Sequence, residues 1–284
     1  MKKFRIILIV MFIHLSLAAW ALADSGAFRE LKEAALAGDA QAQNRLGLIY
    51  AEGQWVAQDY KEAHNWFQVA ANQGYPGAQY NLGVVYNEGL GVERDDKEAL
   101  KWYELAATQG EAKAQYNLGL MHGSGDAVPQ DIIKAIEWKT KAAVRGLSMA
   151  QYNLGMVYSQ GNAVEKDIAE ALKWYAMAAE QGHAKAQYAL GALYYQGEGI
   201  PRDKVEALRW YTKAASRGEV RAQHNLGWMY SQGVGVKQDD AMAIMWLDLA
   251  ADQGDEAALL SRDRLLEKMK TKNPPLQPST EEKK

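Results

Sequence analysis

Apolar residues recur at helical spacing along most of the chain. Between residues 78 and 113, positions i, i+4, i+7 and i+8 are apolar and define one face of an α-helix. These positions hold Ala78, Leu82, Val85 and Tyr86. A second apolar face follows, and it consists of Ala99, Trp102, Tyr103, Ala106 and Ala107. The segment therefore predicts two amphipathic helices, the first ending at Gly89 and the second at Gly110.

The same pattern returns every 36 residues without insertion or deletion. The phrase Ala-Gln-Tyr-Asn-Leu-Gly begins at Ala78, Ala114 and Ala150, and variants begin at Ala42, Ala186 and Ala222. A tryptophan ladder keeps the interval: Trp66, Trp102, Trp138, Trp174, Trp210 and Trp246. A fixed period of this size is typical of a solenoid. We expect the tryptophans to be buried and to tie each unit to the next.

Glycine and aspartate recur at positions that predict how each unit packs. A glycine inside each first helix costs about 1 kcal/mol relative to alanine, so close helix packing is expected to compensate. These glycines are Gly47, Gly83, Gly119, Gly155, Gly191 and Gly227. An N-cap aspartate precedes each second helix: Asp59, Asp95, Asp131, Asp167, Asp203 and Asp239. Four have a glutamate three residues later, which predicts a capping box, so we expect the helices after Asp131 and Asp239 to start less firmly.

The loop between the two helices carries no phosphate-binding signature. Gly89-Leu90-Gly91 has no third glycine, no following Lys-Ser/Thr and no preceding strand. In other units the second loop glycine is replaced by Trp55, Ala127 and Ala163. We therefore expect that a left-handed residue is not obligatory at this position.

Taken together, these residues resemble the Sel-one-like repeat (SLR), a relative of the tetratricopeptide repeat (TPR). The resemblance covers about residues 26–257 and implies an all-α fold, a right-handed α-solenoid superhelix of antiparallel helix pairs. The departures from the family pattern put only local packing in question. They are Trp55, His122, Lys139 and Leu247.

The units and the terminal segments divide the chain as follows. The predicted repeats are 42–77, 78–113, 114–149, 150–185, 186–221 and 222–257. Residues 24–41 and 258–270 are expected to form capping helices, because a solenoid needs a polar outer face at each end. Residues 271–284 contain too few apolar side chains to fold, so we expect a disordered tail.

The first 23 residues have the pattern of a secretory signal peptide. A basic start is followed by an apolar stretch from Ile6 to Trp20 and by Ala21-Leu22-Ala23. We expect cleavage after Ala23 and a periplasmic or secreted protein with no membrane span. An uncleaved membrane anchor is the alternative. With no cysteine in the chain, a lipid anchor, disulfides and thiol chemistry are excluded.

Charge and residue clustering narrow the class of function. The formal net charge is −3, and −6 without the signal segment (29 basic against 35 acidic groups), so no nucleic-acid footprint is expected. His64, His122, His183 and His224 occupy four different repeat positions. No catalytic motif or metal-ligand spacing is present, so we predict no enzyme, no metal and no cofactor. Cysteine-rich relatives have been linked to penicillin binding or β-lactam hydrolysis, but this chain has none of those cysteines.

The face of the first helices opposite the buried arc is the candidate binding surface. It includes the third, seventh and tenth positions of each unit, with the fourth position beside them. The candidate residues are Tyr80, Asn81, Tyr116, Asn117, Tyr152, Asn153, Met156, Tyr188, Tyr195, His224 and Trp228. Tyrosine and tryptophan provide large rigid area with a polar group, which suits a binding surface. We refer to this surface as the first-helix face.

Two interpretations of the first-helix face stay open. The tyrosines either contact a partner or pack between adjacent first helices, and the asparagines either bind a peptide backbone or link neighbouring repeats. The resemblance implies a scaffold for a protein or peptide partner in envelope assembly, signalling or host interaction. The sequence leaves the oligomeric state open, and a monomer is the default expectation. A peptidoglycan or other carbohydrate ligand is the alternative partner.

Overall fold

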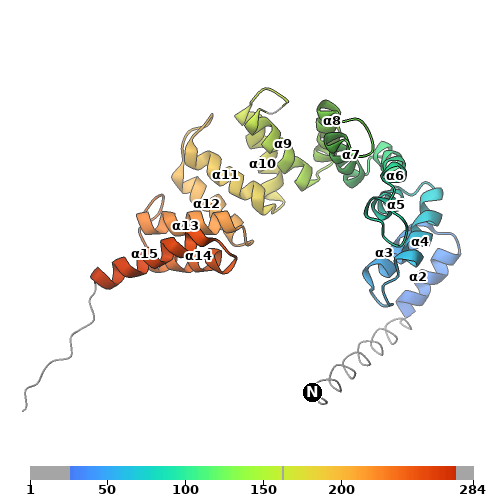
Figure 1. Cartoon of the computed structure of the whole chain (residues 1–284), viewed down its shortest axis with the longest axis horizontal. Helices are drawn as coiled ribbons and strands as arrows, with labels where there is room; N and C mark the ends of the chain where they lie inside the picture. Colours follow the sequence, from blue (N-terminus) through green and yellow to red (C-terminus); the bar gives the residue numbers. More distant parts are fainter. Residues whose placement is uncertain (1–25, 162, 273–284) are drawn as a thin grey trace, which may run out of the picture. The chain divides into compact units, whose positions relative to one another are not determined.

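The computed structural model describes residues 26–161 and 163–272, and every regular element there is an α-helix (Figure 1). The chain divides into two compact units, Met1–Leu147 and Ser148–Lys284. The first contains α2 (Gly26–Leu36), α3 (Ala40–Glu52), α4 (Tyr60–Asn72), α5 (Pro76–Glu88), α6 (Asp96–Thr108), α7 (Ala112–Ser124) and α8 (Ile132–Val144). The second contains α9 (Ser148–Gln160), α10 (Ile168–Glu180), α11 (Ala184–Gln196), α12 (Lys204–Ala215), α13 (Val220–Gln232), α14 (Asp240–Asp252) and α15 (Glu256–Lys272).

Helix boundaries follow the predicted pattern closely. The first helices begin two residues before the Ala-Gln phrase, as α5 does at Pro76, and end at a left-handed glycine such as Gly89. The capping helices are α2 and α15, and α15 includes Thr271 and Lys272, which were predicted to lie in the tail. The predicted signal peptide and the rest of the tail lie outside the described residues.

Each repeat is an antiparallel helix pair because the start of its second helix is bonded to the end of its first. The Asp95 backbone N–H donates to the carbonyl oxygen of Tyr86 over 2.9 Å. Asp59, Asp131, Asp167, Asp203 and Asp239 donate in the same way to Tyr50, His122, Tyr158, Tyr194 and Tyr230. The predicted all-α solenoid of helix pairs is confirmed.

This bond also explains why the predicted capping boxes do not form. The Asp95 side chain caps α6 as expected, by accepting from the N–H groups of Lys97 and Glu98. Its own N–H is already bonded to Tyr86, so Glu98 instead pairs with Lys101. Glu170 and Glu206 likewise pair with Lys173 and Arg209.

The expectation that two second helices start less firmly stays a prediction. Asp131 accepts from the Lys134 N–H and Asp239 from the Met242 N–H, each over 2.9 Å. Asp59, Asp95 and Asp203 each accept from two backbone N–H groups, whereas Asp131, Asp167 and Asp239 each accept from one. Because the N–H of each N-cap aspartate is bonded to its first helix, the missing glutamate removes an i,i+3 ion pair such as that of Glu98 with Lys101, and no capping-box bond.

The glycine inside each first helix makes room for the second helix, as predicted. A Cβ at Gly191 would lie 2.6 Å from Cδ1 of Tyr211, and one at Gly155 would lie 2.5 Å from Cδ1 of Tyr175. Carbon atoms do not approach this closely, so the tyrosine ring occupies the space that any side chain would need. The glycine and the residue after each tryptophan therefore form a matched pair.

A left-handed residue is not obligatory at the second loop position, as expected, because Ala127 does not have a positive φ, although Trp55 and Ala163 do. Trp55 has φ 62° and Ala163 has φ 68°, close to the 74° of the equivalent Gly91. A left-handed non-glycine residue costs about 1–2 kcal/mol. At Gly91 a Cβ would lie 2.6 Å from the carbonyl carbon of Tyr60, whereas Trp55 packs edge-on against Phe28 with ring centroids 6.0 Å apart. At Gly91 and Trp55 the left-handed conformation is thus accompanied by close packing on the preceding helices.

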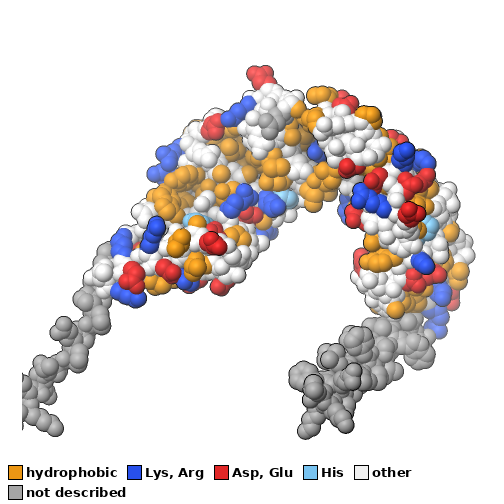
Figure 2. All heavy atoms as spheres, viewed as in Figure 1, with side chains coloured by type: hydrophobic (Ala, Val, Ile, Leu, Met, Phe, Trp, Pro, Cys, Tyr) orange, Lys and Arg blue, Asp and Glu red, His pale blue; other side chains and the backbone are white. Residues whose placement is uncertain are grey.

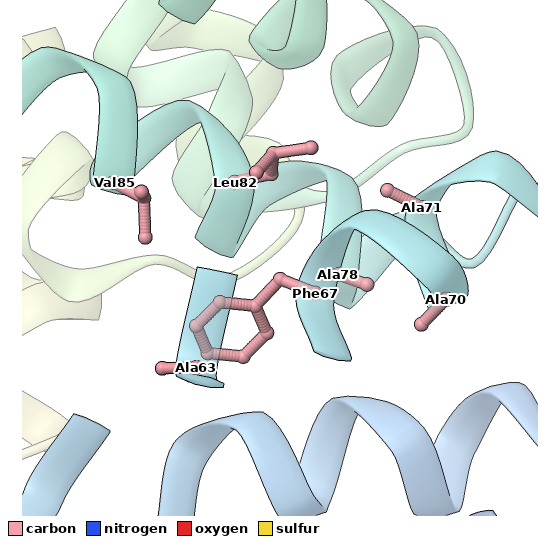
Figure 3. Close-up of a cluster of buried hydrophobic side chains, with 7 residues drawn as sticks. All are labelled: Ala63, Phe67, Ala70, Ala71, Ala78, Leu82 and Val85. Carbon is pink, nitrogen blue, oxygen red and sulfur yellow. The ribbon is translucent and has the colours of Figure 1, made fainter. Parts of the chain in front are cut away.

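The hydrophobic core is built between consecutive repeats. One buried cluster joins α4 to α5 and consists of Ala63, Phe67, Ala70, Ala71, Ala78, Leu82 and Val85 (Figure 3). Trp102 of α6 packs on this cluster while only partly buried. The following residue, Tyr103, is 2% exposed and is the more deeply buried of the two. The tryptophans therefore link repeats as predicted, but their neighbours fill the core.

The recurrent glutamine of the opening phrase is a buried bridge between repeats. Gln223 is 4% exposed, and its Nε2 donates to the carbonyl of Ala215 over 3.2 Å. Its Oε1 accepts from Gln253 Nε2, 30 residues later, over 2.8 Å. The same glutamine pairs join Gln43 to Gln73, Gln79 to Gln109 and Gln151 to Gln181. This residue supports the fold.

In two repeats an arginine replaces the partner glutamine, so the hydrogen bond between the two glutamines is missing. Arg217 replaces the partner glutamine, and within the described residues Gln187 Oε1 is buried without a hydrogen-bond partner. Arg217→Gln is expected to raise the free energy of unfolding by about 1 kcal/mol, because it supplies the missing donor. Urea denaturation measures this, with Arg209→Gln, which removes a charge from an exposed ion pair, as the control. Equal midpoints for Arg217→Gln and the unmodified chain would contradict the bridge.

Candidate functional site

In the first unit, the first-helix face is largely taken up by contacts within repeats and between them. The ring of Tyr80 is 6.0 Å from that of Tyr103, between centroids. Asn81 Nδ2 donates to Asn44 Oδ1 over 2.8 Å. Burial raises the pKa of Tyr103, and the hydrogen bond of its hydroxyl with Asn117 partly opposes this. The remaining candidates, Tyr116 and Asn117, are half-buried.

The same tyrosine positions are covered in the second unit. Tyr152 stacks on His183 with ring centroids 4.8 Å apart. The Tyr188 ring is 5.6 Å from that of Tyr211, and the guanidinium of Arg221 lies 4.3 Å from its centroid.

The three further candidates from the sequence, Met156, Asn153 and His224, each have different surroundings. Met156 is partly buried against the core cluster around Tyr175, so it belongs to the packing of the unit. Asn153 is half-buried. His224 Nδ1 lies 2.9 Å from Asp255 Oδ2, which links α13 to the start of α15.

Asp255 is at the same time the N-terminal cap of α15. Its Oδ1 accepts from the Ala258 N–H over 3.0 Å. Burial alone would raise the pKa of Asp255, but the bonds from the Ala258 amide and from His224 outweigh it and lower the pKa. His224 therefore takes part in a structural contact rather than an open site.

Tyr195 and Trp228 are the candidates that line an open pocket. Their rings meet edge to face with centroids 6.1 Å apart. A pocket of about 220 Å³ is lined by Tyr195, Tyr211, Asn225, Trp228 and Met229. Trp228 is 43% exposed, whereas the other sequence-predicted site residues are at least half-buried. We call this the Tyr195 pocket.

A second pocket shares Trp228 with the first and was not predicted. It also has a volume of about 220 Å³, and its lining consists of Trp228, Ser231, Gln232, Leu247, Ser261, Arg264, Leu265 and Lys268. The sequence analysis treated α15 as a cap with a polar outer face. The available signal was the spacing of Arg264 and Lys268, four residues apart on one helix face. We call this the Arg264 pocket.

A model of the Sel1 repeat matches six consecutive segments: 40–75, 76–111, 112–146, 148–183, 184–219 and 220–255. The chain belongs to the Sel1 repeat family. This confirms the predicted family. Proteins with this repeat are typically protein-interaction scaffolds, and those with this fold are mostly non-enzymatic.

Solved structures agree with this assignment. The Sel1 protein is 36% identical to c5321, a protective antigen of uropathogenic Escherichia coli strains with an SLR fold, at a TM-score of 0.80. The match covers 85% of this chain and 52% of that antigen, about half its length. A Sel1 repeat protein from Oxalobacter formigenes is 40% identical, with a TM-score of 0.72 and coverage of 76% and 89%. A search of curated proteins found no match.

The part of the Sel1 protein that the structure describes gives little support for metal binding, membrane insertion or nucleic-acid binding. Within residues 26–161 and 163–272, no three His, Asp or Glu side chains are grouped to hold a metal ion. No helix in those ranges is long and apolar enough to cross a membrane. On the face visible in Figure 2, cationic and anionic side chains are interspersed, without a continuous cationic stripe.

One titratable group is buried away from these pockets. His122 is 5% exposed and replaces the tyrosine found at this position in the other repeats. Burial lowers the pKa of His122 below its usual value, and Lys134 acts in the same direction, while Asp131 and Glu104 oppose them. The folded protein therefore holds this proton less firmly than the unfolded chain does.

This shift predicts that stability decreases in mild acid. Once the pH falls below about 6.5, the unfolded chain binds more protons than the folded one, and the free energy of unfolding declines. His122→Tyr is expected to reduce the decline between pH 7 and pH 5, as measured by urea midpoints. Burial also lowers the pKa of His183, so part of the decline remains in that variant. Parallel curves for the variant and the unmodified chain would contradict a contribution from His122.

Proposed function

We propose that this Sel1 protein is an exported scaffold that binds a segment of a partner protein on the first-helix face of α11 and α13. The observation that carries the proposal is the exposed ring of Trp228 beside the Tyr195 pocket. Elsewhere on the first-helix face, Tyr80 and Tyr188 pack against tyrosines of their own repeats, and Asn81 bonds to Asn44 of the preceding repeat. An exposed tryptophan at the edge of a pocket is typical of the residues that dominate binding energy.

The shape of the Tyr195 pocket favours a protein segment over a glycan. A sugar ring stacks on a flat, open aromatic face, but Tyr195 and Trp228 meet edge to face. The Tyr188 ring is covered by Arg221 and the Tyr152 ring by His183. A pocket of about 220 Å³ with one amide, Asn225, suits a single apolar side chain and one backbone bond.

Export is part of the proposal and rests on the N-terminal sequence. The basic start, the apolar stretch and Ala21-Leu22-Ala23 support secretion through a cleaved signal peptide. The related c5321 is a protective antigen, which supports a role in the cell envelope or in contact with a host. Mass spectrometry of the protein from cells is expected to show a chain that begins at Asp24. A chain that begins at Met1 would contradict cleavage.

Site-specific photo-crosslinking tests the binding proposal. A benzoyl-phenylalanine is placed at Tyr195, at Trp228 or, as a control, at Met177, which is 43% exposed on a second helix. We expect the same crosslinked protein from positions 195 and 228 and not from 177. Adducts that are equally strong from all three positions, or none from 195 and 228, would contradict a partner on the first-helix face.

A further inference from the structure

The Arg264 pocket contains cations and no acidic side chain. Two of its lining residues, Arg264 and Lys268, are cationic, and Trp228 forms an aromatic wall. Leu247 and Leu265 are the apolar part of the lining and are each almost fully buried. A pocket with this lining attracts an anionic group attached to an apolar body.

The two cations of the pocket differ from their neighbours on α15. Arg262 pairs with Asp248 over 2.9 Å and with Asp263 over 2.7 Å. Lys270 pairs with Glu267 over 2.8 Å. Among residues 26–161 and 163–272, Arg264 and Lys268 have no carboxylate within ion-pairing distance. The charges that face the pocket are therefore the uncompensated ones.

The polar groups beside these cations do not replace a carboxylate. The Ser231 hydroxyl donates to the carbonyl of Trp228, and the Ser261 hydroxyl donates to that of Ala257, each over 2.8 Å. Gln232 Nε2 donates to Ser231 Oγ over 3.0 Å. These groups are satisfied within α13 and α15, so recognition of an anion depends on Arg264 and Lys268.

We propose that the Arg264 pocket binds a carboxylate of an acidic peptide segment, and that an apolar side chain of the same segment enters the Tyr195 pocket. Trp228 lines both pockets, so a peptide segment that contacts its ring can reach residues of α11, α13 and α15. A guanidinium presents a planar fork that matches a carboxylate, and the nearby ammonium adds a second charge. This inference rests on the proposed function and specifies the chemistry of the partner.

A partner segment fits the charges better than the chain's own C-terminus does. Residues 273–284 contain Glu281 and Glu282, but Lys283 and Lys284 follow them directly. Docking this sequence would bring two cations next to Arg264 and Lys268. An acidic segment without adjacent lysines avoids that repulsion.

A random peptide library displayed on phage tests the inference with the full mature chain. We expect selected peptides to combine Asp or Glu with a neighbouring Trp, Phe or Leu. The best one is then synthesised with a fluorophore, together with a copy in which each acid is changed to its amide. Because the two cations are exposed, we expect the amide copy to bind roughly 10-fold more weakly, which corresponds to about 1.4 kcal/mol.

Charge reversal provides the matched variants. Arg264→Glu with Lys268→Glu is expected to weaken binding of the acidic peptide at least 10-fold and to keep the circular dichroism spectrum, because both side chains are exposed. Arg264→Lys with Lys268→Arg is expected to retain most of the affinity. Arg29→Glu with Lys32→Glu makes the same change of net charge on exposed α2 and is expected to leave binding unchanged.

Three outcomes would overturn the inference. Peptides that depend on Trp228 but show no acidic preference would leave the proposed function standing and remove the role of the cations. Binding of purified peptidoglycan that is lost on charge reversal, with no acidic peptides selected, would assign the pocket to a glycan. A five-fold gain in peptide affinity for Glu281→Gln with Glu282→Gln would show that the chain's own C-terminus occupies the pocket.

Discussion

Gly191→Ala is expected to lower the free energy of unfolding by about 2 kcal/mol, although alanine is the better helix former. Propensity alone would stabilise α11 by about 1 kcal/mol. The added Cβ, however, would lie 2.6 Å from the ring of Tyr211, which is 3% exposed and packed in the core cluster of α12 and α13. Forcing one extra methyl group into a closely packed core costs about 1–3 kcal/mol.

A double-mutant cycle separates packing from propensity. In the Tyr211→Ala background the ring is absent, so Gly191→Ala is expected to become neutral or stabilising by up to about 1 kcal/mol. Urea denaturation of the four proteins measures the coupling. A loss of similar size in both backgrounds would show that Tyr211 is not what restricts this position to glycine.

Trp228→Ala is expected to weaken the complex with the partner captured at Tyr195 by roughly 30-fold or more. Truncating an interface tryptophan that lines a pocket commonly costs at least about 2 kcal/mol of binding free energy. Trp228 lines both pockets of the proposed site, so its loss removes contacts on two sides. Titration of the purified partner, followed by calorimetry, gives the change in dissociation constant.

The control for this measurement is Leu249→Ala. Leu249 is 42% exposed, close to the 43% of Trp228, but it lies on the second helix α14 and in neither pocket. We expect its replacement to leave the dissociation constant unchanged. Equal losses for the two variants would place the partner elsewhere on the protein.

Repetition explains why most of the fold was predictable from sequence. The same local pattern occurs six times at an interval of 36 residues, so the helix pair, its glycine and its N-cap aspartate are easily recognised. The close contact at Gly155 and Gly191 is one consequence that the structure confirms. These features are local or lie between adjacent helices, where spacing along the chain determines which side chains meet.

Local preference was a poor guide where a contact between helices competed with it. The Asp95 N–H could bond to Glu98 or to the Tyr86 carbonyl, and only the return of α6 beside α5 makes the second bond available. Trp55 does not resemble a left-handed residue, yet packing against Phe28 accompanies that conformation. In both cases a contact distant in sequence overrode a local preference.

The sequence by itself determined the family, the all-α repeat, the helix boundaries to within about two residues and the positions of the first-helix face. The tertiary structure decided which of those positions are open. Tyr80 and Tyr188 recur with the repeat and pack against buried tyrosines of their own repeats, whereas Trp228 breaks the pattern and stays 43% exposed. Arg264 and Lys268 join Trp228 only because α15 packs beside α13 and α14. The lining of a pocket depends on the distances between helices. These distances cannot be read from the spacing of residues along one helix.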